Sequence, residues 1–213
     1  MSFEVEVEIK QGDTTVRADF ESSDGVTALF GPSGAGKTSI LQAVAGLLKP
    51  RSGRIVVEGK VLFDSREGID LKPEKRECGY VFQDSRLFPH RSVKKNLLYG
   101  WRLKRPEQRW LAPEVAIEFL GIGHLLGRLP RSLSGGEAQR VAIGRALLSG
   151  PRFLAMDEPL ASLDAARREE IMGLIERIRD ELRIPILYVS HDRGEVERLA
   201  GQIIPIDPAA TCN

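Results

Sequence analysis

The sequence predicts an α/β fold with a mainly parallel sheet core, an antiparallel β edge and an inserted helical subdomain. From residue 26 onward, short apolar runs alternate with helical stretches, which is typical of a parallel sheet covered on both faces. The N-terminal residues alternate charged and apolar positions instead, which indicates a half-buried antiparallel hairpin. Pro, Trp, Arg and short helical stretches dominate from about residue 87 to 131. This helical lobe is expected to be an insertion within one domain spanning residues 1–213.

Local signals place each element along the chain. Alternation indicates the hairpin strands, uniformly apolar runs the buried strands, and apolar positions three and four residues apart the helices. Gly46 closes the first helix, Gly150 and Pro151 close another, and Pro185 opens the last strand. The expected elements are strands at residues 3–9, 16–20 and 26–30, a helix at 37–46, strands at 54–58 and 79–82, helices at 114–120 and 135–148, a strand at 153–156, a helix at 165–182 whose apolar face is Ile171, Leu174, Ile175, Ile178 and Leu182, and a strand at 186–189.

Composition excludes several classes of protein. Apolar content of 42% and charged content of 29% are ordinary for a globular chain, and no apolar run approaches the roughly 20 residues that span a bilayer. A formal net charge of +1 argues against a nucleic-acid partner, which needs a strongly basic face. The acid-rich N-terminus resembles neither a signal nor a transit peptide. Cys78 and Cys212 form no disulfide framework, so a reducing cytosol is expected, with Cys78 a small core residue.

A glycine-rich run between the strand at 26–30 and the next helix matches the phosphate-loop pattern Gly-x4-Gly-Lys-Thr. Its glycines let the backbone wrap around a phosphate, and N–H groups at the helix start face the anion. Lys37 suits the β- and γ-phosphates of ATP, and the Thr38 hydroxyl suits Mg²⁺. The flanking strand and helix disfavour the alternative, a glycine-rich turn with a coincidental lysine. The expected ATP-binding residues are Gly31, Pro32, Ser33, Gly34, Ala35, Gly36, Lys37, Thr38 and Ser39.

Two carboxylates, Asp157 and Glu158, follow the buried strand at 153–156, where open α/β sheets bind their ligands. Asp157 suits Mg²⁺ ligation, directly or through water, and Glu158 suits polarising the water that attacks ATP. In isolation, two acids before Pro159 would be an ordinary strand end. The phosphate loop in the same chain favours the catalytic interpretation.

Four further segments resemble the motifs of one family. Leu133-Ser-Gly-Gly-Glu-Ala-Gln-Arg140 resembles the signature sequence of ABC ATPases, and Asp157-Glu-Pro-Leu-Ala-Ser-Leu-Asp164 resembles their joined Walker B motif and D-loop. Ser190-His-Asp192 resembles their switch-histidine segment, and Phe82-Gln-Asp84 resembles their Q-loop. Together with the phosphate loop, these motifs occur in the order found in the family, and the resemblance covers essentially the whole chain.

The resemblance implies a role for each motif. His191 would hydrogen-bond the γ-phosphate and hold Glu158 and the attacking water in register. Gln83 would contact Mg²⁺ and this water and report to the helical lobe, so the implied metal contacts are Thr38, Gln83 and Asp157. Asp164 would organise the seam of a homodimer. In that dimer each subunit would close its signature over the partner's ATP through Ser134, Gly135, Gly136 and Glu137.

Two departures from the family pattern stand out. The family usually has an aromatic side chain near the first hairpin that stacks on adenine, and residues 10–14 offer none. Weak selectivity for the base is therefore expected. Glu137 replaces the commoner Gln of the signature, which is a frequent variant.

Within the family, the sequence is most similar to the ATPase subunits of bacterial molybdate importers. The similarity rests on residues 30–39, 79–100, 141–148 and 184–191. It implies a peripheral ATPase at the cytoplasmic face of the cell membrane that drives an importer of molybdate or a related oxyanion. Its partners would be a second copy, integral permease subunits and an upstream substrate-binding protein.

The segment from Gln83 to His90 would border the groove that receives the permease's coupling helix. Arg86 and Phe88 are candidate contacts, with a simple hinge of the helical lobe as the equal alternative. Molybdate-family subunits usually continue into an oxyanion-binding β domain. This domain is expected to be absent from the chain, either because the protein lacks it or because the gene is shortened, so feedback by molybdate through it is not expected of the chain as it stands.

Other functions remain as alternatives. The chain could serve another ABC importer, for sulfate, iron, sugar or polyamine. An exporter is disfavoured because no membrane helices are fused to the chain. A soluble ABC protein acting on DNA or ribosomes would carry long coiled coils or a second ATPase unit. A non-catalytic module would lack Glu158 or His191.

Overall fold

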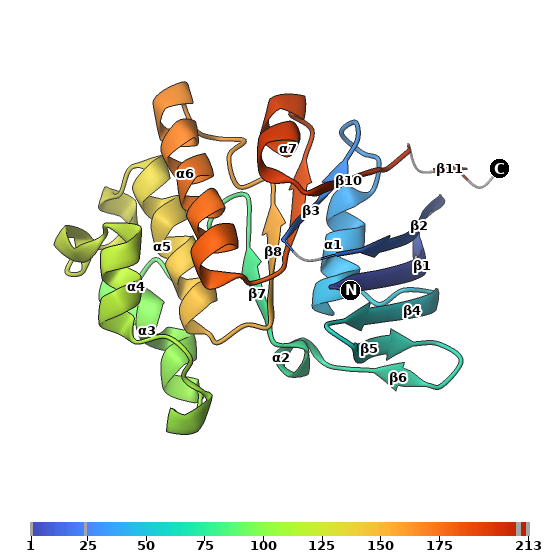
Figure 1. The fold of residues 1–213 in the computed structure, drawn as a ribbon, viewed down its shortest axis with the longest axis horizontal. Coiled ribbons are helices and arrows are strands. Elements are labelled where there is room, and N and C mark those ends of the chain that lie inside the picture. Colours follow the sequence, from blue (N-terminus) through green and yellow to red (C-terminus); the bar gives the residue numbers. More distant parts are fainter. Residues whose placement is uncertain (1, 24, 208–209, 212–213) are drawn as a thin grey trace.

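The computed structural model describes residues 2–23, 25–207 and 210–211, and it confirms the predicted α/β fold. In Figure 1 the helices α3 to α6 cover one face of the parallel sheet, α1 covers the other, and the antiparallel sheet packs beyond α1. The strands are β1 (Phe3–Gln11), β2 (Thr14–Ser22), β3 (Val26–Phe30), β4 (Ser52–Val57), β5 (Lys60–Asp64), β6 (Ile69–Asp70), β7 (Cys78–Val81), β8 (Phe153–Asp157), β9 (Ile186–Ser190), β10 (Gln202–Pro205) and β11 (Ala210–Thr211). The α-helices are α1 (Lys37–Ala45), α2 (Pro73–Arg76), α3 (Val93–Leu103), α4 (Pro113–Leu120), α5 (Gly135–Leu148), α6 (Ala165–Arg177) and α7 (Arg193–Leu199).

The antiparallel sheet has the strand order β11-β2-β1-β4-β5-β6. The predicted hairpin is confirmed, because β1 pairs with β2 from Phe3 opposite Ser22 to Gln11 opposite Thr14. Alternation along β1 buries its apolar residues against α1 and leaves its charged residues on the outer face. This sheet therefore supplies a wall beside the phosphate loop.

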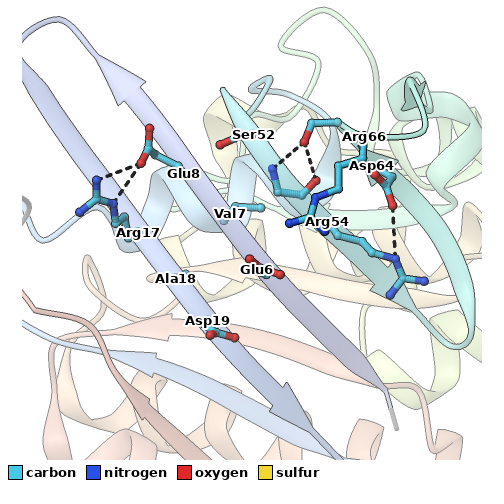
Figure 2. A pocket seen from close by; sticks show the side chains of 12 residues that line it. Glu6, Val7, Glu8, Arg17, Ala18, Asp19, Ser52, Arg54, Asp64 and Arg66 are labelled. Carbon is cyan, nitrogen blue, oxygen red and sulfur yellow. Dashed lines mark hydrogen bonds and ion pairs between the residues drawn. The ribbon is translucent and has the colours of Figure 1, made fainter.

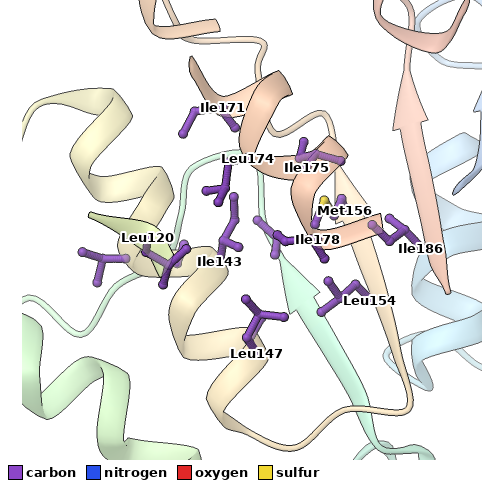
Figure 3. Packing of buried hydrophobic residues seen from close by; sticks show 14 of the residues in the cluster. Leu120, Ile143, Leu147, Leu154, Met156, Ile171, Leu174, Ile175, Ile178 and Ile186 are labelled. Carbon is purple, nitrogen blue, oxygen red and sulfur yellow. The ribbon is translucent and has the colours of Figure 1, made fainter. Parts of the chain in front are cut away.

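The parallel sheet has the strand order β10-β3-β9-β8-β7. Successive side chains of β8 point to opposite faces, so Phe153 and Ala155 join the core on the α1 side. Leu154 and Met156 join the core on the helical side, where Figure 3 shows them beside Ile178, in the same cluster as Ile143 and Leu147 of α5. The same alternation places Asp157 on the α1 side, next to the phosphate loop.

Several elements differ from the sequence-based expectations. The α-helix expected to Leu182 ends at Arg177, and Ile178–Leu182 forms a wider π-helical turn in which Arg183 donates its N–H to the Ile178 carbonyl at 3.2 Å. The strand expected at 54–58 ends at Val57, since Glu58 adopts a left-handed conformation (φ 50°). Seven elements were not predicted individually: β5, β6, α2, α3, α7, β10 and β11. All except α3 are short or depend on pairing with distant strands. Helix α3 lies in the region for which the sequence predicted only unspecified short helices.

The described structure also bears on the two cysteines and on membrane-spanning helices. Cys78 is half-buried and packs against the core on the α1 side, where burial raises the pKa of its thiol. Cys212 lies outside the described residues. Within the described ranges, none of the helices combines the length and apolar character needed to cross a membrane.

Candidate functional site

The phosphate loop connects the end of β3 to the start of α1. Gly34 and Gly36 hold left-handed conformations (φ 82° and 92°), which few residues other than glycine adopt. Lys37 is buried and donates from Nζ to the carbonyls of Gly31 and Pro32, at 2.8 and 2.9 Å. Burial lowers the pKa of Lys37, while the carboxylates of Glu158 and Asp157 oppose that shift. The lysine thus holds the loop in shape and stays close to two acids.

A pocket of about 380 Å³ opens over this loop. Its walls come from three places: the phosphate loop with the first turn of α1, the β1–β2 hairpin, and Glu158 after β8. Ser39 ties two of these walls together, because its hydroxyl donates to Gln11 Oε1 at 2.9 Å. The lining residues are Gln11, Thr14, Val16, Ser33, Gly34, Gly36, Lys37, Thr38, Ser39 and Glu158.

Asp157 accepts one hydrogen bond on each carboxylate oxygen. Thr38 Oγ1 donates to Oδ1 at 2.8 Å, and the Tyr80 hydroxyl donates to Oδ2 at 3.1 Å. Burial, followed by the charge of Asp157, raises the pKa of Tyr80, so its hydroxyl stays protonated and remains a donor. The predicted site residues Thr38 and Asp157 are therefore brought together, and Tyr80 is a third member that the sequence reasoning missed.

The oxygen atoms beside this pocket fit Mg²⁺. A hydroxyl and a carboxylate are hard oxygen donors, and Mg²⁺ usually binds through one or two protein oxygens together with phosphates and water. The described residues contain no group of three or more His, Cys, Asp or Glu side chains that could hold a metal alone. The residues present thus suit a metal that arrives with a phosphate ligand.

Glu158 and His191 meet at the ends of neighbouring strands. The imidazole Nδ1 lies 3.0 Å from Glu158 Oε2, and the Glu158 N–H donates to the Val189 carbonyl at 3.0 Å. Glu158 adopts a left-handed conformation (φ 42°), which is uncommon for a side-chain-bearing residue and frequent at functional sites. The predicted pair of catalytic residues is therefore in direct contact.

A buried hydrogen-bond cluster supports the segment that carries His191. The carboxylate of Glu195 accepts from Ser190 Oγ at 2.8 Å and from the Tyr188 hydroxyl at 2.9 Å. Arg168 on α6 donates to Asp192 Oδ2 at 3.1 Å, which joins this segment to the helix that begins at Asp164. This cluster could not be predicted from the sequence, because its members come from β9, α7 with its N-cap, and α6.

The predicted signature residues lie away from the phosphate pocket. Ser134 is the N-cap of α5 and forms a capping box with Glu137: the Ser134 N–H donates to Glu137 Oε2 at 2.7 Å, and the Glu137 N–H donates to Ser134 Oγ at 3.3 Å. An added Cβ at Gly135 would lie 3.1 Å from Leu163, so the α5 start packs closely against the loop before α6. Asp164 caps α6 by accepting the Arg167 N–H at 3.0 Å.

Gln83 also lies outside the phosphate pocket. It lines a separate hollow of about 360 Å³ together with Gly135 and Ala138 of the signature helix. The structure thus joins Thr38 to Asp157 and Glu158 to His191, and gathers Gln83 with the signature helix instead of with either pair.

The segment after Gln83 has an unusual backbone held by α5. Ser85 and Arg86 are both left-handed (φ 58° and 41°), and Arg145 donates to their two carbonyls at 3.0 and 2.7 Å. The Arg86 guanidinium stacks over the Phe82 ring at 4.3 Å. Phe88 is fixed by the buried Asn96, which bonds to both its N–H and its carbonyl. Arg86 and Phe88 are therefore held in defined positions beside the hollow.

A larger hollow, of about 500 Å³, lies on the outer face of the antiparallel sheet. Figure 2 shows its charged side chains, among which Arg17 pairs with Glu8 at 3.0 Å and Arg54 pairs with Asp64 at 3.4 Å. These pairs neutralise much of its charged lining. The hollow is on the opposite face of the sheet from α1, so it is separate from the phosphate pocket.

Comparison with known proteins gives close relatives. The molybdenum import ATP-binding protein ModC of Brucella abortus (strain 2308) is 57% identical over 201 residues, which are 94% of this chain and 55% of the relative. The protein of the same name from Mesorhizobium japonicum is 54% identical over 204 residues, 96% of this chain and 55% of the relative. The chain thus spans a little over half the length of the curated relatives it matches.

Solved structures and a family comparison agree with these relatives. The cbiO1 protein of Clostridium perfringens, part of the ABC transporter complex cbiONQ, aligns with a TM-score of 0.81 at 31% identity, over 97% of this chain and 84% of that one. A bacterial ABC transporter cassette solved as a dimer aligns with a TM-score of 0.76 at 24% identity, over 100% of this chain and 98% of that one, and shows the same fold. The family described as ABC transporter matches residues 17–161. The predicted resemblance is confirmed: the chain belongs to the ABC transporter family.

Proposed function

We propose that this chain binds Mg-ATP and hydrolyses it to drive a bacterial importer of molybdate or a related oxyanion. The chemistry is supported by the pocket that Lys37, Thr38 and Glu158 line together, with Asp157 hydrogen-bonded to Thr38 at its edge. The observation that carries the substrate class is the identity of 52 to 57% to ModC proteins over most of the chain.

Each group of residues at the site has a separate proposed role in ATP hydrolysis. Successive N–H groups of the phosphate loop and Lys37 would bind the phosphates. Thr38 and Asp157 would hold the metal, which would neutralise phosphate charge. Glu158 polarises the attacking water, and His191 fixes the orientation of that carboxylate through their 3.0 Å contact. Gln83 is proposed to complete the metal and water contacts when the hollow beside it closes.

The proposed active unit is a homodimer. Within one chain, none of the signature residues lines the phosphate pocket, and Gly135 and Ala138 line a different hollow, so the signature of the same chain does not complete that pocket. The start of α5 presents N–H groups at a helix N-terminus, which suits an anion. A second copy stacked head to tail would bring Ser134 to Glu137 over the bound ATP, with Asp164 at the seam.

Transport requires membrane partners. We propose that the ATPase dimer sits at the cytoplasmic face of the cell membrane on integral permease subunits, with a substrate-binding protein upstream. Arg86 and Phe88 are the proposed permease contacts, because Arg145 and Asn96 hold them at the edge of the helical lobe. Importers for other substrates, such as sulfate, remain the alternative that the transport assay below addresses.

Glu158→Gln tests the hydrolytic function. This variant should bind ATP normally, hydrolyse it at least ~100-fold more slowly because the general base is lost, and accumulate as an ATP-bound dimer in size-exclusion chromatography. Turnover at the wild-type rate in Glu158→Gln would show that another group activates the water.

The substrate is tested by reconstituting the chain with the permease encoded beside it and measuring ATP-dependent uptake of molybdate, tungstate and sulfate. Uptake of molybdate and tungstate is expected. Uptake of sulfate alone would contradict the assignment to molybdate while leaving the ATPase proposal intact.

A further inference from the structure

We propose that Tyr80 is a positioning residue that fixes the carboxylate of Asp157 for Mg²⁺ and thereby sets the metal affinity of the nucleotide site. The inference rests on the proposed function, because it concerns the metal that accompanies ATP. Tyr80 lies outside the five sequence motifs and is not among the residues that line the phosphate pocket, and its hydroxyl donates to Asp157.

Strand register brings the two residues together. β7 and β8 are parallel neighbours, with Tyr80 opposite Ala155 and Val81 opposite Met156. Side chains of Tyr80, Ala155 and Asp157 all point to the α1 face, since residues two apart on a strand share a face. A tyrosine is long enough to reach past Ala155 to the carboxylate beyond it, whereas a shorter polar side chain at this position is not.

The two hydrogen bonds act on Asp157 from opposite elements. Thr38 approaches Oδ1 from the first turn of α1, and Tyr80 approaches Oδ2 from the neighbouring strand. Asp157 itself is buried (8% exposed), so the carboxylate plane is set by these two donors. Loss of one donor would leave the carboxylate free to turn about its last bond, and a metal ligand that must first be oriented binds more weakly.

The ring of Tyr80 is itself held in place. It packs on Phe82 with the ring centroids 4.3 Å apart, and the guanidinium of Arg86 lies over the Phe82 ring at 4.3 Å. Arg145 in turn fixes the Arg86 carbonyl at 2.7 Å. The packed ring therefore positions the hydroxyl at Asp157. Because this packing does not involve the hydroxyl, the ring should keep its position when the hydroxyl is removed.

Tyr80→Phe is the matching variant, because it removes the hydroxyl and keeps the ring. The metal is probed with Mn²⁺, whose free-ion electron paramagnetic resonance signal falls on binding, in the presence of ADP. We expect the Mn²⁺ dissociation constant of the ADP complex to rise roughly tenfold, a typical effect for an outer partner of a metal ligand. The affinity for ADP alone, measured by calorimetry in EDTA, should equal that of the wild-type chain.

Tyr188→Phe is the control for losing a buried hydroxyl. Tyr188 is on β9, the neighbour of β8 on the side away from β7, and its side chain is fully buried. Its hydroxyl donates to Glu195 at 2.9 Å and not to Asp157. It should lower thermal stability as much as Tyr80→Phe or more, and leave the Mn²⁺ dissociation constant unchanged.

The outcomes separate the two proposals. An unchanged Mn²⁺ affinity in Tyr80→Phe, or an equal loss in Tyr188→Phe, would overturn the positioning role. An equal loss of ADP affinity in EDTA would also overturn it, because the effect would then be on the pocket as a whole. Failure of the wild-type chain to bind ADP in either buffer would instead contradict the proposed ATPase function.

Discussion

His191 Nδ1 and Glu158 Oε2 lie 3.0 Å apart, although they follow two different strands, β8 and β9. The two strands are parallel neighbours, with Asp157 opposite Val189, so each carboxyl-terminal end presents its next side chain to the same edge. Glu158 is mostly buried and His191 is half-exposed, so the imidazole is accessible to solvent.

This contact predicts that the two side chains act as a unit. His191→Ala and Glu158→Gln should each reduce ATP hydrolysis strongly, and the double variant should be little slower than the slower single variant, because each removes the same aligned carboxylate. Steady-state phosphate release from the four proteins measures this. Multiplicative losses in the double variant would show that His191 and Glu158 act independently.

The phosphate loop predicts different effects at two glycines. Gly34→Ala suffers only backbone strain, about 1–2 kcal/mol, since an added Cβ there meets no atom within 4 Å. Gly36→Ala suffers the same strain and places its Cβ 2.5 Å from Val16 Cγ2, so it should be clearly less stable and lose more ADP affinity. Adding Val16→Ala removes the two closest carbons but leaves the Val16 Cβ 3.1 Å from the new Cβ, so it should recover only part of the steric loss. Urea unfolding and calorimetry measure both effects, and equal losses in the two single variants would refute the predicted contact with Val16.

Buried Arg76 predicts a large stability effect far from the pocket. Its guanidinium donates to the carbonyls of Ala43 and Val44 at the end of α1, and it pairs with Asp70 at 3.0 Å. Arg76→Met would remove these hydrogen bonds from a buried charged donor and should cost about 3 kcal/mol or more in free energy of unfolding. The exposed pair of Arg17 with Glu8 provides the control, because Arg17→Met should change the free energy of unfolding by less than about 1 kcal/mol. Similar urea midpoints for the two variants would contradict this.

The capping box of α5 predicts a pH-dependent contribution to stability. Hydrogen bonding from the Ser134 N–H holds the pKa of Glu137 below its ordinary value of 4.5. A lowered folded-state pKa stabilises the fold above pH 4.5, and this contribution disappears as the pH falls through the folded-state value. Glu137→Gln keeps the box but does not titrate, so the stability difference between it and the wild-type chain should change below pH 4.5.

Glu137→Ala lacks the box and should lose about 1 kcal/mol at neutral pH. Urea unfolding of the three proteins from pH 7 to pH 3 tests both statements. A constant difference between Glu137→Gln and wild type over that range would rule out the titration of Glu137 as a source of stability.

Much of the fold follows from local sequence. The hairpin of β1 and β2, the buried strand β3, the helices α1 and α5 and the strand β8 are all predicted within a few residues, because alternation, apolar runs and capping residues act over one turn or one strand. Elements such as β10 lack that local signal. It becomes a strand because Gln202 to Pro205 pair with β3. The residues next to it in the sequence do not predict this pairing.

The sequence likewise determined the chemistry of single positions. A glycine-rich loop followed by a lysine and a threonine, in a chain with two acids at the end of a buried strand, is a pattern typical of a phosphate-binding site. Tertiary structure alone decided which side chains meet. The Tyr80–Asp157 and Arg76–α1 contacts depend on strand order and on the side to which each residue points, and both are properties of the packed sheet. A hydrogen bond between residues distant in the chain leaves no periodic trace in the sequence, so it becomes visible only once the strands are side by side.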